Sequence, residues 1–195
     1  MRDQLERALA TADLLEGRKL VGVRSVGGSS VGSTWRLSLH DGEQLFVKVA
    51  QTANLLAELS GLQALRHWAE PALIEVPQVL GCLPLSGQSA LVMAWWDASK
   101  GDQFRLGRGL AQLHRASAVA GPGCFGWDHD GFIGLGLQPS GWCDSWGDAF
   151  TQLRLHPQLC LASEWGLAAQ DWEPLLGPIA AWLNRHAPEP CLVHG

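Results

Sequence analysis

The spacing of apolar residues in the first half of the chain changes from helical to alternating, and each change predicts a new element. Residues 4–15 carry apolar side chains at intervals of three and four, which predicts an amphipathic helix. Residues 20–26, 35–39 and 45–49 are short apolar runs of strand length, and an Asp-Gly pair between the last two favours a hairpin turn. We therefore expect an antiparallel meander after the first helix.

A second helical pattern and two further apolar runs complete this region. Residues 53–69 repeat leucines at helical spacing, and Pro71 closes the pattern. Residues 76–82 and 89–95 are runs of strand length. Three strands, a helix and two strands in this order predict an α+β fold, with a five-stranded antiparallel sheet and one main helix.

The character of the sequence changes after Trp96, where a polar linker begins. Helical patterns then cover three segments, 103–118, 145–166 and 171–187. The intervening residues 119–144 are rich in Gly, Pro and Asp, which is typical of a long functional loop. We therefore expect two lobes, residues 1–96 and residues 97–195, of which the second is mainly helical.

Composition narrows the class of protein. The 195 residues are 47% hydrophobic with a net charge of −5, which allows a real core and leaves no basic cluster for nucleic acid. No apolar run approaches the roughly 20 residues that span a bilayer, and the amphipathic N-terminus does not resemble a signal peptide. We expect a cytoplasmic protein that binds neither nucleic acid nor membrane. The five cysteines are odd in number and lack CxxC spacing, which favours buried, reduced thiols over a metal site.

Two motifs point to phosphate chemistry. The first two strands are joined by a turn containing Gly27, Gly28 and Gly32, and glycine lets backbone amides approach a phosphate closely. The third strand carries Lys48, which needs an anionic partner if it points inward, and Glu58 on the next helix is the candidate. The alternative for the glycine turn is a plain hairpin loop. The alternative for Lys48 and Glu58 is that each is solvated separately. In kinases, a glycine loop, a strand lysine and a helix glutamate follow one another in this order.

The fifth strand runs into the polar linker, where backbone groups can pair with a purine and flat side chains can enclose it. The candidates at this end are Met93, Ala94, Trp95, Trp96 and Asp97. As an alternative, Met93 and Trp95 belong to the core.

The loop at 119–144 mixes aromatic and polar residues in a way that suits a sugar-like ligand. Asp130 and Trp142 are the candidate contacts, and a loop packed by its own side chains is the alternative. At the chain end, an apolar triplet runs into His194-Gly195, which predicts a strand entering a turn.

These residues resemble the fructosamine (ketosamine) kinase family, whose fold is protein-kinase-like and related to the aminoglycoside and choline kinases. The resemblance extends over nearly the whole chain. Its most specific residues are Ile133-Gly134, Gln138-Pro139, Trp142, Trp146, Phe150, Arg154-Leu155 and Gln158-Leu159. The final residues Leu192 to Gly195 resemble the start of the family's catalytic loop, His-Gly-Asp-Leu-Trp-x-Gly-Asn. In that case His194 begins the motif, and the catalytic Asp would follow Gly195.

The resemblance implies ATP- and Mg²⁺-dependent phosphorylation of a ketosamine hydroxyl, typically the 3-hydroxyl, on a small molecule or a protein, as a deglycation repair step. It implies that Lys48 holds phosphates, that Glu58 pairs with Lys48, and that residues 93–97 surround adenine. Without the catalytic Asp, we expect the 195 residues to be inactive and the helical lobe to be incomplete. A kinase of the same fold that acts on an aminoglycoside, choline or another metabolite is a second hypothesis. A non-catalytic remnant is a third.

Overall fold

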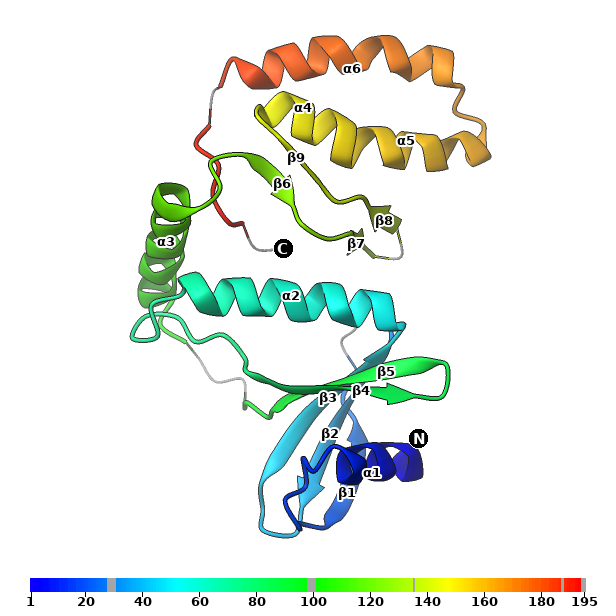
Figure 1. The fold of residues 1–195 in the computed structure, drawn as a ribbon, viewed down its shortest axis with the longest axis vertical. Coiled ribbons are helices and arrows are strands. Elements are labelled where there is room, and N and C mark those ends of the chain that lie inside the picture. The colour runs from blue at the N-terminus through cyan, green and yellow to red at the C-terminus, as the bar shows by residue number, and fades with distance from the viewer. Residues whose placement is uncertain (28–30, 98–100, 135, 187, 194–195) are drawn as a thin grey trace. The chain divides into compact units, whose positions relative to one another are not determined.

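The computed structural model describes residues 1–27, 31–97, 101–134, 136–186 and 188–193, so Gly28 and His194 lie outside the described residues. The chain divides into two compact units, Met1–Gly109 and Leu110–Gly195 (Figure 1). The lobe boundary that the sequence suggests, between residues 96 and 97, stays a prediction. No helix in the described ranges is long and apolar enough to cross a membrane.

The first unit is built on one antiparallel sheet. Its elements are α1 (Arg2–Thr11), β1 (Leu20–Ser25), β2 (Ser33–Leu39), β3 (Gln44–Ala50), α2 (Thr52–Trp68), β4 (Val79–Leu85) and β5 (Gln88–Ala94). The strands lie in the order β1-β2-β3-β5-β4, and every neighbouring pair is antiparallel. The predicted five-stranded sheet with one main helix is confirmed. Strand β4 begins later than residue 76, because Pro77 has no N–H to donate to a ladder.

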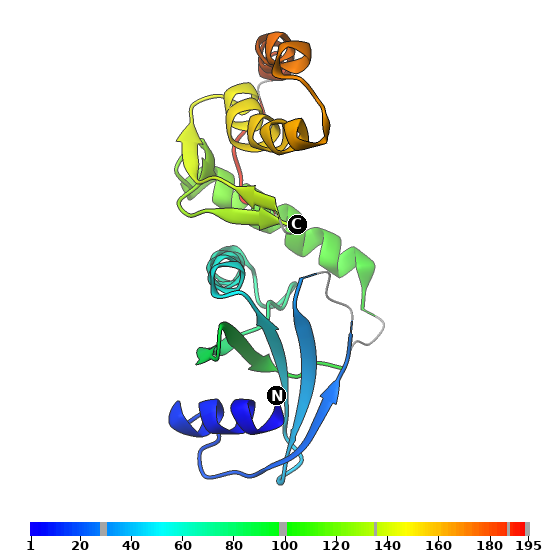
Figure 2. The same ribbon diagram turned by 90° about the vertical axis from the view of Figure 1, so that its right-hand side faces the viewer.

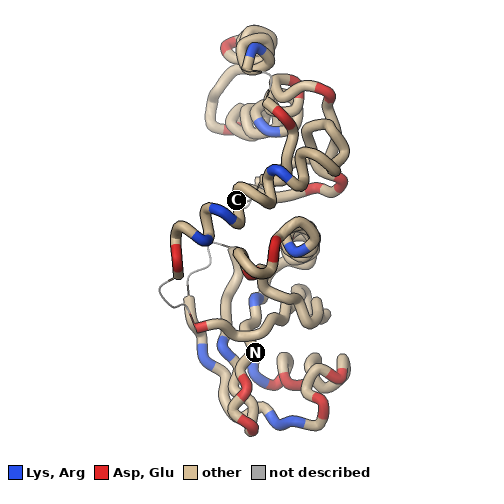
Figure 3. Tube along the Cα trace, turned by 90° about the vertical axis from the view of Figure 1, so that its left-hand side faces the viewer, with Lys and Arg blue, Asp and Glu red and all other residues tan. Residues whose placement is uncertain are grey.

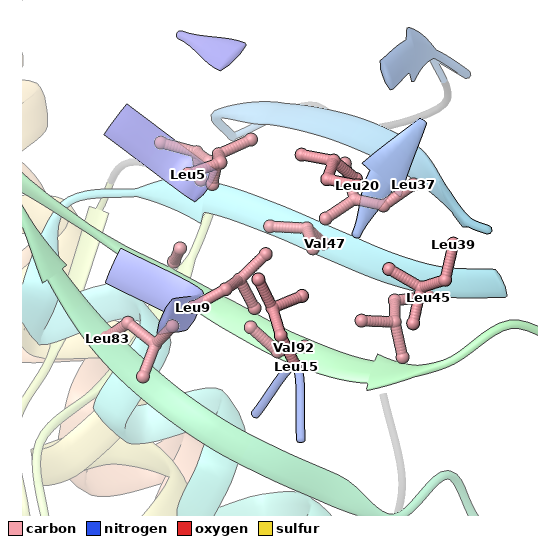
Figure 4. Close-up of a cluster of buried hydrophobic side chains, with 12 residues drawn as sticks. Leu5, Leu9, Leu15, Leu20, Leu37, Leu39, Leu45, Val47, Leu83 and Val92 are labelled. Carbon is pink, nitrogen blue, oxygen red and sulfur yellow. The ribbon is translucent and has the colours of Figure 1, made fainter. Parts of the chain in front are cut away.

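The two faces of this sheet pack against different helices, α1 and α2 (Figure 2). Along β3, Leu45, Val47 and Val49 are buried in a cluster that includes leucines of α1 (Figure 4). Successive strand residues point to opposite faces, so Phe46 and Lys48 lie on the side of α2. Phe46 accordingly packs with the cluster that α2 contributes to. Both faces of the sheet are therefore occupied, and α2 lies on the face that carries Lys48.

The second unit combines short strands with helices. Helix α3 (Gln103–Ala120) spans the boundary between the units. It is followed by β6 (Phe125–Trp127), β7 (Gly131–Ile133), β8 (Gly136–Gln138), β9 (Gly141–Cys143), α4 (Trp146–Phe150), the π-helical turn η1 (Thr151–Leu155), α5 (His156–Ala162), the 3₁₀ turn η2 (Ser163–Trp165) and α6 (Ala169–Asn184). Strand β6 pairs with β9 and β7 pairs with β8, which makes two nested antiparallel ladders.

The predicted loop at 119–144 therefore contains four strands that the sequence pattern did not reveal. Each strand is three residues long, which is too short for alternation to be visible. The outer ladder depends on Gly126, with φ +149°, because a Cβ there would overlap the carbonyl oxygen of Gly141. The predicted helix at 145–166 is likewise interrupted by the π-helical turn, where the Thr151 hydroxyl donates to the Gly147 carbonyl oxygen at 2.7 Å.

Leu192, among the last described residues, bonds within the second unit. The backbone N–H of Leu192 donates to the hydroxyl oxygen of Ser117, a buried residue of α3, at 2.9 Å. The described residues 188–193 form no strand. The strand predicted before His194 is therefore wrong for these residues, of which Leu192 bonds to a helix side chain.

The cysteine thiols are all free, as expected, but they are less buried than the sequence suggested. Cys160 is exposed, and the other four cysteines are half-buried. Burial raises the pKa of Cys82. Burial also raises the pKa of Cys143, and the nearby carboxylates of Asp148 and Asp144 add to that rise. Both shifts keep these thiols protonated over a wider pH range and so keep them unreactive.

Candidate active site

Lys48 and Glu58 form an ion pair, with 2.6 Å between Nζ and Oε2. The strand period places Lys48 on the face covered by α2, and only Gln51 separates β3 from that helix. The helix therefore folds straight back over the strand and brings its second turn to the lysine. The structure joins the two side chains that the sequence paired, while their role in holding a nucleotide stays a prediction.

This ion pair is partly open to solvent, with the Lys48 side chain 22% exposed and the Glu58 side chain 32% exposed. A pair with this exposure contributes only about 0–1 kcal/mol to folding. The sheet does not depend on it, and the ammonium group remains accessible to a further anion. The arrangement can hold a phosphate oxygen at Lys48 while Glu58 keeps the lysine oriented.

The glycine turn between β1 and β2 is held close to this pair. Gly27 and Gly32 have positive φ, +69° and +86°. The Thr34 hydroxyl donates to the Gly27 carbonyl oxygen at 2.5 Å, which closes the base of the turn. A Cβ on Gly32 would overlap the carbonyl oxygen of Val49, the residue after Lys48. The turn therefore lies against the end of β3, beside the lysine.

The five candidates at the end of β5 have different surroundings. Met93 is 5% exposed and packs in the cluster beneath α2, which agrees with the core alternative for its side chain. Ala94 is exposed and ends the strand. The Trp95 indole N–H donates to a carboxylate oxygen of Asp97 at 2.7 Å. Trp96 is 42% exposed. Trp95 is half-buried, so the exposed flat side chain at this end of the strand is that of Trp96.

Asp130 lies just before β7 and Trp142 lies in β9, and each bonds to another residue of this region. The Asp130 carboxylate accepts the backbone N–H of Ser140 at 2.7 Å. The Trp142 indole N–H donates to Asp128 at 2.9 Å, while the ring stays 40% exposed. These bonds favour the alternative of a self-packed loop for Asp130. The exposed Trp142 ring remains able to stack on a ligand.

Asp130 also offers a test of this loop by pH. Hydrogen bonds from the Ser140 backbone and side chain lower the pKa of Asp130 from its ordinary value of 3.8. A lowered pKa in the folded state means that the bonds stabilise the loop above pH 3.8, and that this contribution fades as pH falls through the lower value. We expect Ser140→Ala to move the Asp130 midpoint part of the way back, because the backbone N–H remains. Carboxyl ¹³C NMR titration measures both midpoints, and identical midpoints would contradict the assignment.

Two residues on the π-helical turn and α5 brace the inner ladder, and sequence reasoning gave them no role. Arg154 donates to the carbonyl oxygen of Pro139 at 3.2 Å, and burial lowers the pKa of its guanidinium. Gln158 donates to the carbonyl oxygen of Leu137 at 3.1 Å. Their separation of four residues puts both on one side of a helix, and this spacing is the signal that could have revealed them.

A glycine turn, a strand lysine paired with a helix glutamate and a following helix-rich unit are the features of the kinase class. Solved structures agree with this class. The structure of a proposed fructosamine-3-kinase from Haemophilus somnus 129PT matches with a TM-score of 0.81 at 25% identity, covering 100% of this chain and 65% of that one. That of a proposed fructosamine-3-kinase from Thermobifida fusca matches with a TM-score of 0.73 at 27% identity, covering 97% and 66%.

The chain belongs to the fructosamine kinase family, whose model matches residues 3–195. A probable ketoamine kinase of Synechocystis is 36% identical over 179 residues, which cover 88% of this chain and 58% of the relative. The protein-ribulosamine 3-kinase, chloroplastic, of Arabidopsis thaliana is 31% identical over 195 residues, which cover 93% of this chain and 57% of that protein. The chain thus spans less than two thirds of the length of these relatives.

Proposed function

We propose that the whole protein transfers a phosphoryl group from ATP to a hydroxyl of a ketosamine, free or protein-bound, as a step in deglycation. The observation that carries this proposal is the Lys48–Glu58 pair at 2.6 Å beside the glycine turn. The family and the names of the ketoamine and ribulosamine kinases support the choice of substrate. We place the reaction in the cytoplasm, although the Arabidopsis relative is named chloroplastic.

In this proposal, residues 1–96 form the nucleotide-binding lobe. Lys48 binds phosphate oxygens, Glu58 orients Lys48, and the turn from Gly27 through Gly28 to Gly32 covers the phosphates. The backbone from Met93 to Asp97 pairs with adenine. The accessible ammonium group fits a phosphate oxygen, because the sheet does not depend on the ion pair, and the backbone N–H groups of a glycine turn are suited to add further donors to an anion.

Mg²⁺ would neutralise the phosphate charge during transfer. Within the described ranges, no three His, Cys, Asp or Glu residues gather closely enough to hold a metal ion. In this proposal, the described residues supply the phosphate clamp. The resemblance to the family's catalytic loop implies that the metal-binding carboxylate and the catalytic Asp follow residue 195. We propose that residues 97–195 form an incomplete helical lobe. In that lobe, the exposed Trp142 ring stacks on the sugar.

The experiment is a phosphoryl-transfer assay with Mg-ATP and fructosyl-lysine or ribulosyl-lysine. We expect residues 1–195 to bind ATP without measurable turnover, because in this proposal the catalytic base and the metal carboxylate lie beyond residue 195. A fusion of residues 1–195 to the remaining C-terminal part of the Synechocystis relative is expected to restore turnover. The same fusion carrying Lys48→Met is the matched control and should be inactive.

Each other outcome of this assay favours a different hypothesis. Turnover by residues 1–195 alone would contradict the proposed division of labour. Phosphorylation of an aminoglycoside or choline, with none of either ketosamine, would favour a kinase of the same fold with another substrate. A fusion that folds and binds ATP but phosphorylates no member of the panel would favour a remnant.

A further inference from the structure

A row of four side chains crosses the sheet on the face toward α2. The strand register sets Arg24 of β1 opposite Arg36 of β2, Arg36 opposite Phe46 of β3, and Phe46 opposite Met93 of β5. Residues directly opposite one another point to the same face. Helix α2 packs on β3, β4 and β5, and Arg24 at the β1 end of the row is exposed. The row therefore runs from the core beneath α2 to two neighbouring guanidinium groups.

Among the described residues, neither arginine forms an ion pair that would account for its position in the sheet. In the described part of the chain, neither Arg24 nor Arg36 lies within 4.0 Å of a carboxylate oxygen. Like charges directly opposite one another in a ladder are destabilising. Figure 3 marks the basic positions on these strands in blue. The positive charge at this edge therefore calls for an explanation other than the stability of the sheet.

A contact between Arg36 and the ring of Trp95 supplies such an explanation. The Arg36 guanidinium carbon lies 4.7 Å from the ring centroid, which is a cation–π contact. The centroid of the Phe46 ring lies 6.4 Å from that of the Trp95 ring, and the two ring planes are inclined at 37°. The indole N–H donates to Asp97 at 2.7 Å, and the Trp95 backbone N–H donates to the Gln44 carbonyl oxygen at 3.1 Å. The side chain and the backbone of Trp95 are thus both held where β5 gives way to the linker.

We infer that Arg36 is a positioning residue for the base end of the nucleotide site and acts through Trp95. This inference rests on the proposed function, in which residues 93–97 pair with the base. Asp97 is exposed and lies only two residues beyond Trp95, so it moves with the same segment and cannot anchor it alone. Arg36 comes from β2, a different strand, and ties the Trp95 ring to the rigid sheet. The Trp95 backbone N–H is already donated to Gln44, which leaves the base to pair with other backbone groups of this segment.

The neighbouring Arg24 provides a matched control. It has the same charge, lies on the same face and stands directly opposite Arg36 in the register, yet no ring contact joins it to Trp95 within the described residues. A general effect of positive charge on a nucleotide would be shared by both arginines. An effect through the Trp95 ring belongs to Arg36 alone.

The experiment is binding of the fluorescent nucleotide N-methylanthraniloyl-ATP to residues 1–195, read as energy transfer from tryptophan. We expect Arg36→Met to raise the Kd about fivefold, and Arg24→Met to change it less than about twofold. Arg36→Lys keeps a cation near the ring and should stay within about twofold of the wild type. Trp95→Phe should reduce the energy transfer, which shows that the nucleotide lies near that indole.

Thermal unfolding of each variant separates a folding defect from a binding defect, and Arg36→Gln supplies the same test if Arg36→Met does not fold. Equal weakening by Arg24→Met and Arg36→Met, or an unchanged Kd in Arg36→Met, would overturn the inference and leave the proposed nucleotide site intact. Absence of binding by the wild-type chain would overturn the nucleotide site and the inference together.

Discussion

Gly32→Ala is expected to lower the free energy of unfolding of the first unit by roughly 3 kcal/mol or more. Two independent penalties add at this position. Gly32 has φ +86°, a conformation that strains any residue with a Cβ. The added Cβ would also overlap the Val49 carbonyl oxygen and lie 2.8 Å from the Ala50 Cβ, and both neighbours belong to β3. The end of β3 would have to move, and Lys48 with it.

Gly27→Ala is the control for this effect, since Gly27 has φ +69° but open space where the added Cβ would lie. Its free energy of unfolding should fall only by the cost of placing a residue with a Cβ at positive φ, about 1–2 kcal/mol. Urea unfolding followed by far-ultraviolet circular dichroism measures both variants. Equal losses would show that the close approach of Gly32 to β3 does not exist.

Lys48→Met is expected to raise the Kd for Mg-ATP by about 10- to 100-fold, because it removes charge-assisted bonds to phosphate. Its effect on the free energy of unfolding should stay below about 1 kcal/mol, since the ion pair is partly exposed. Lys19→Met is the control, because Lys19 is exposed just before β1. Calorimetric titration gives the Kd of each variant, and thermal unfolding gives its stability.

The Glu58→Gln variant extends this prediction to the second member of the pair. If Glu58 acts by orienting Lys48, Glu58→Gln weakens ATP binding less than Lys48→Met does. The double variant should then bind no more weakly than Lys48→Met alone. Additive losses would contradict this, because they would mean that Glu58 affects the nucleotide independently of Lys48.

The sequence predicted the sheet and the Lys48–Glu58 pair for the same physical reason. Strand and helix periods decide which face each side chain takes, and β3 and α2 are adjacent in the chain with one residue between them. Their contact therefore needs only local geometry. The glycine turn was also visible, because its glycines stand between two clear strands.

The contacts that the sequence did not reveal depend on pairing between distant segments. Arg36 meets Trp95 only because β5 inserts beside β3, and the strand order β3-β5-β4 cannot be read from periodicity. The ladder of β6 and β9 depends on the close approach of Gly126 to Gly141 rather than on an alternating pattern. For Met93, the sequence left both core and nucleotide contact open, since an apolar strand end suits either.

The most direct test of the kinase assignment is a calorimetric titration of wild-type residues 1–195 with Mg-ATP. We expect one saturable site, competition by ADP, and a Kd about 10- to 100-fold higher in Lys48→Met. Absence of binding by a folded wild-type chain, or equal binding by wild type and Lys48→Met, would contradict the claim that this lysine and its glutamate form a nucleotide clamp.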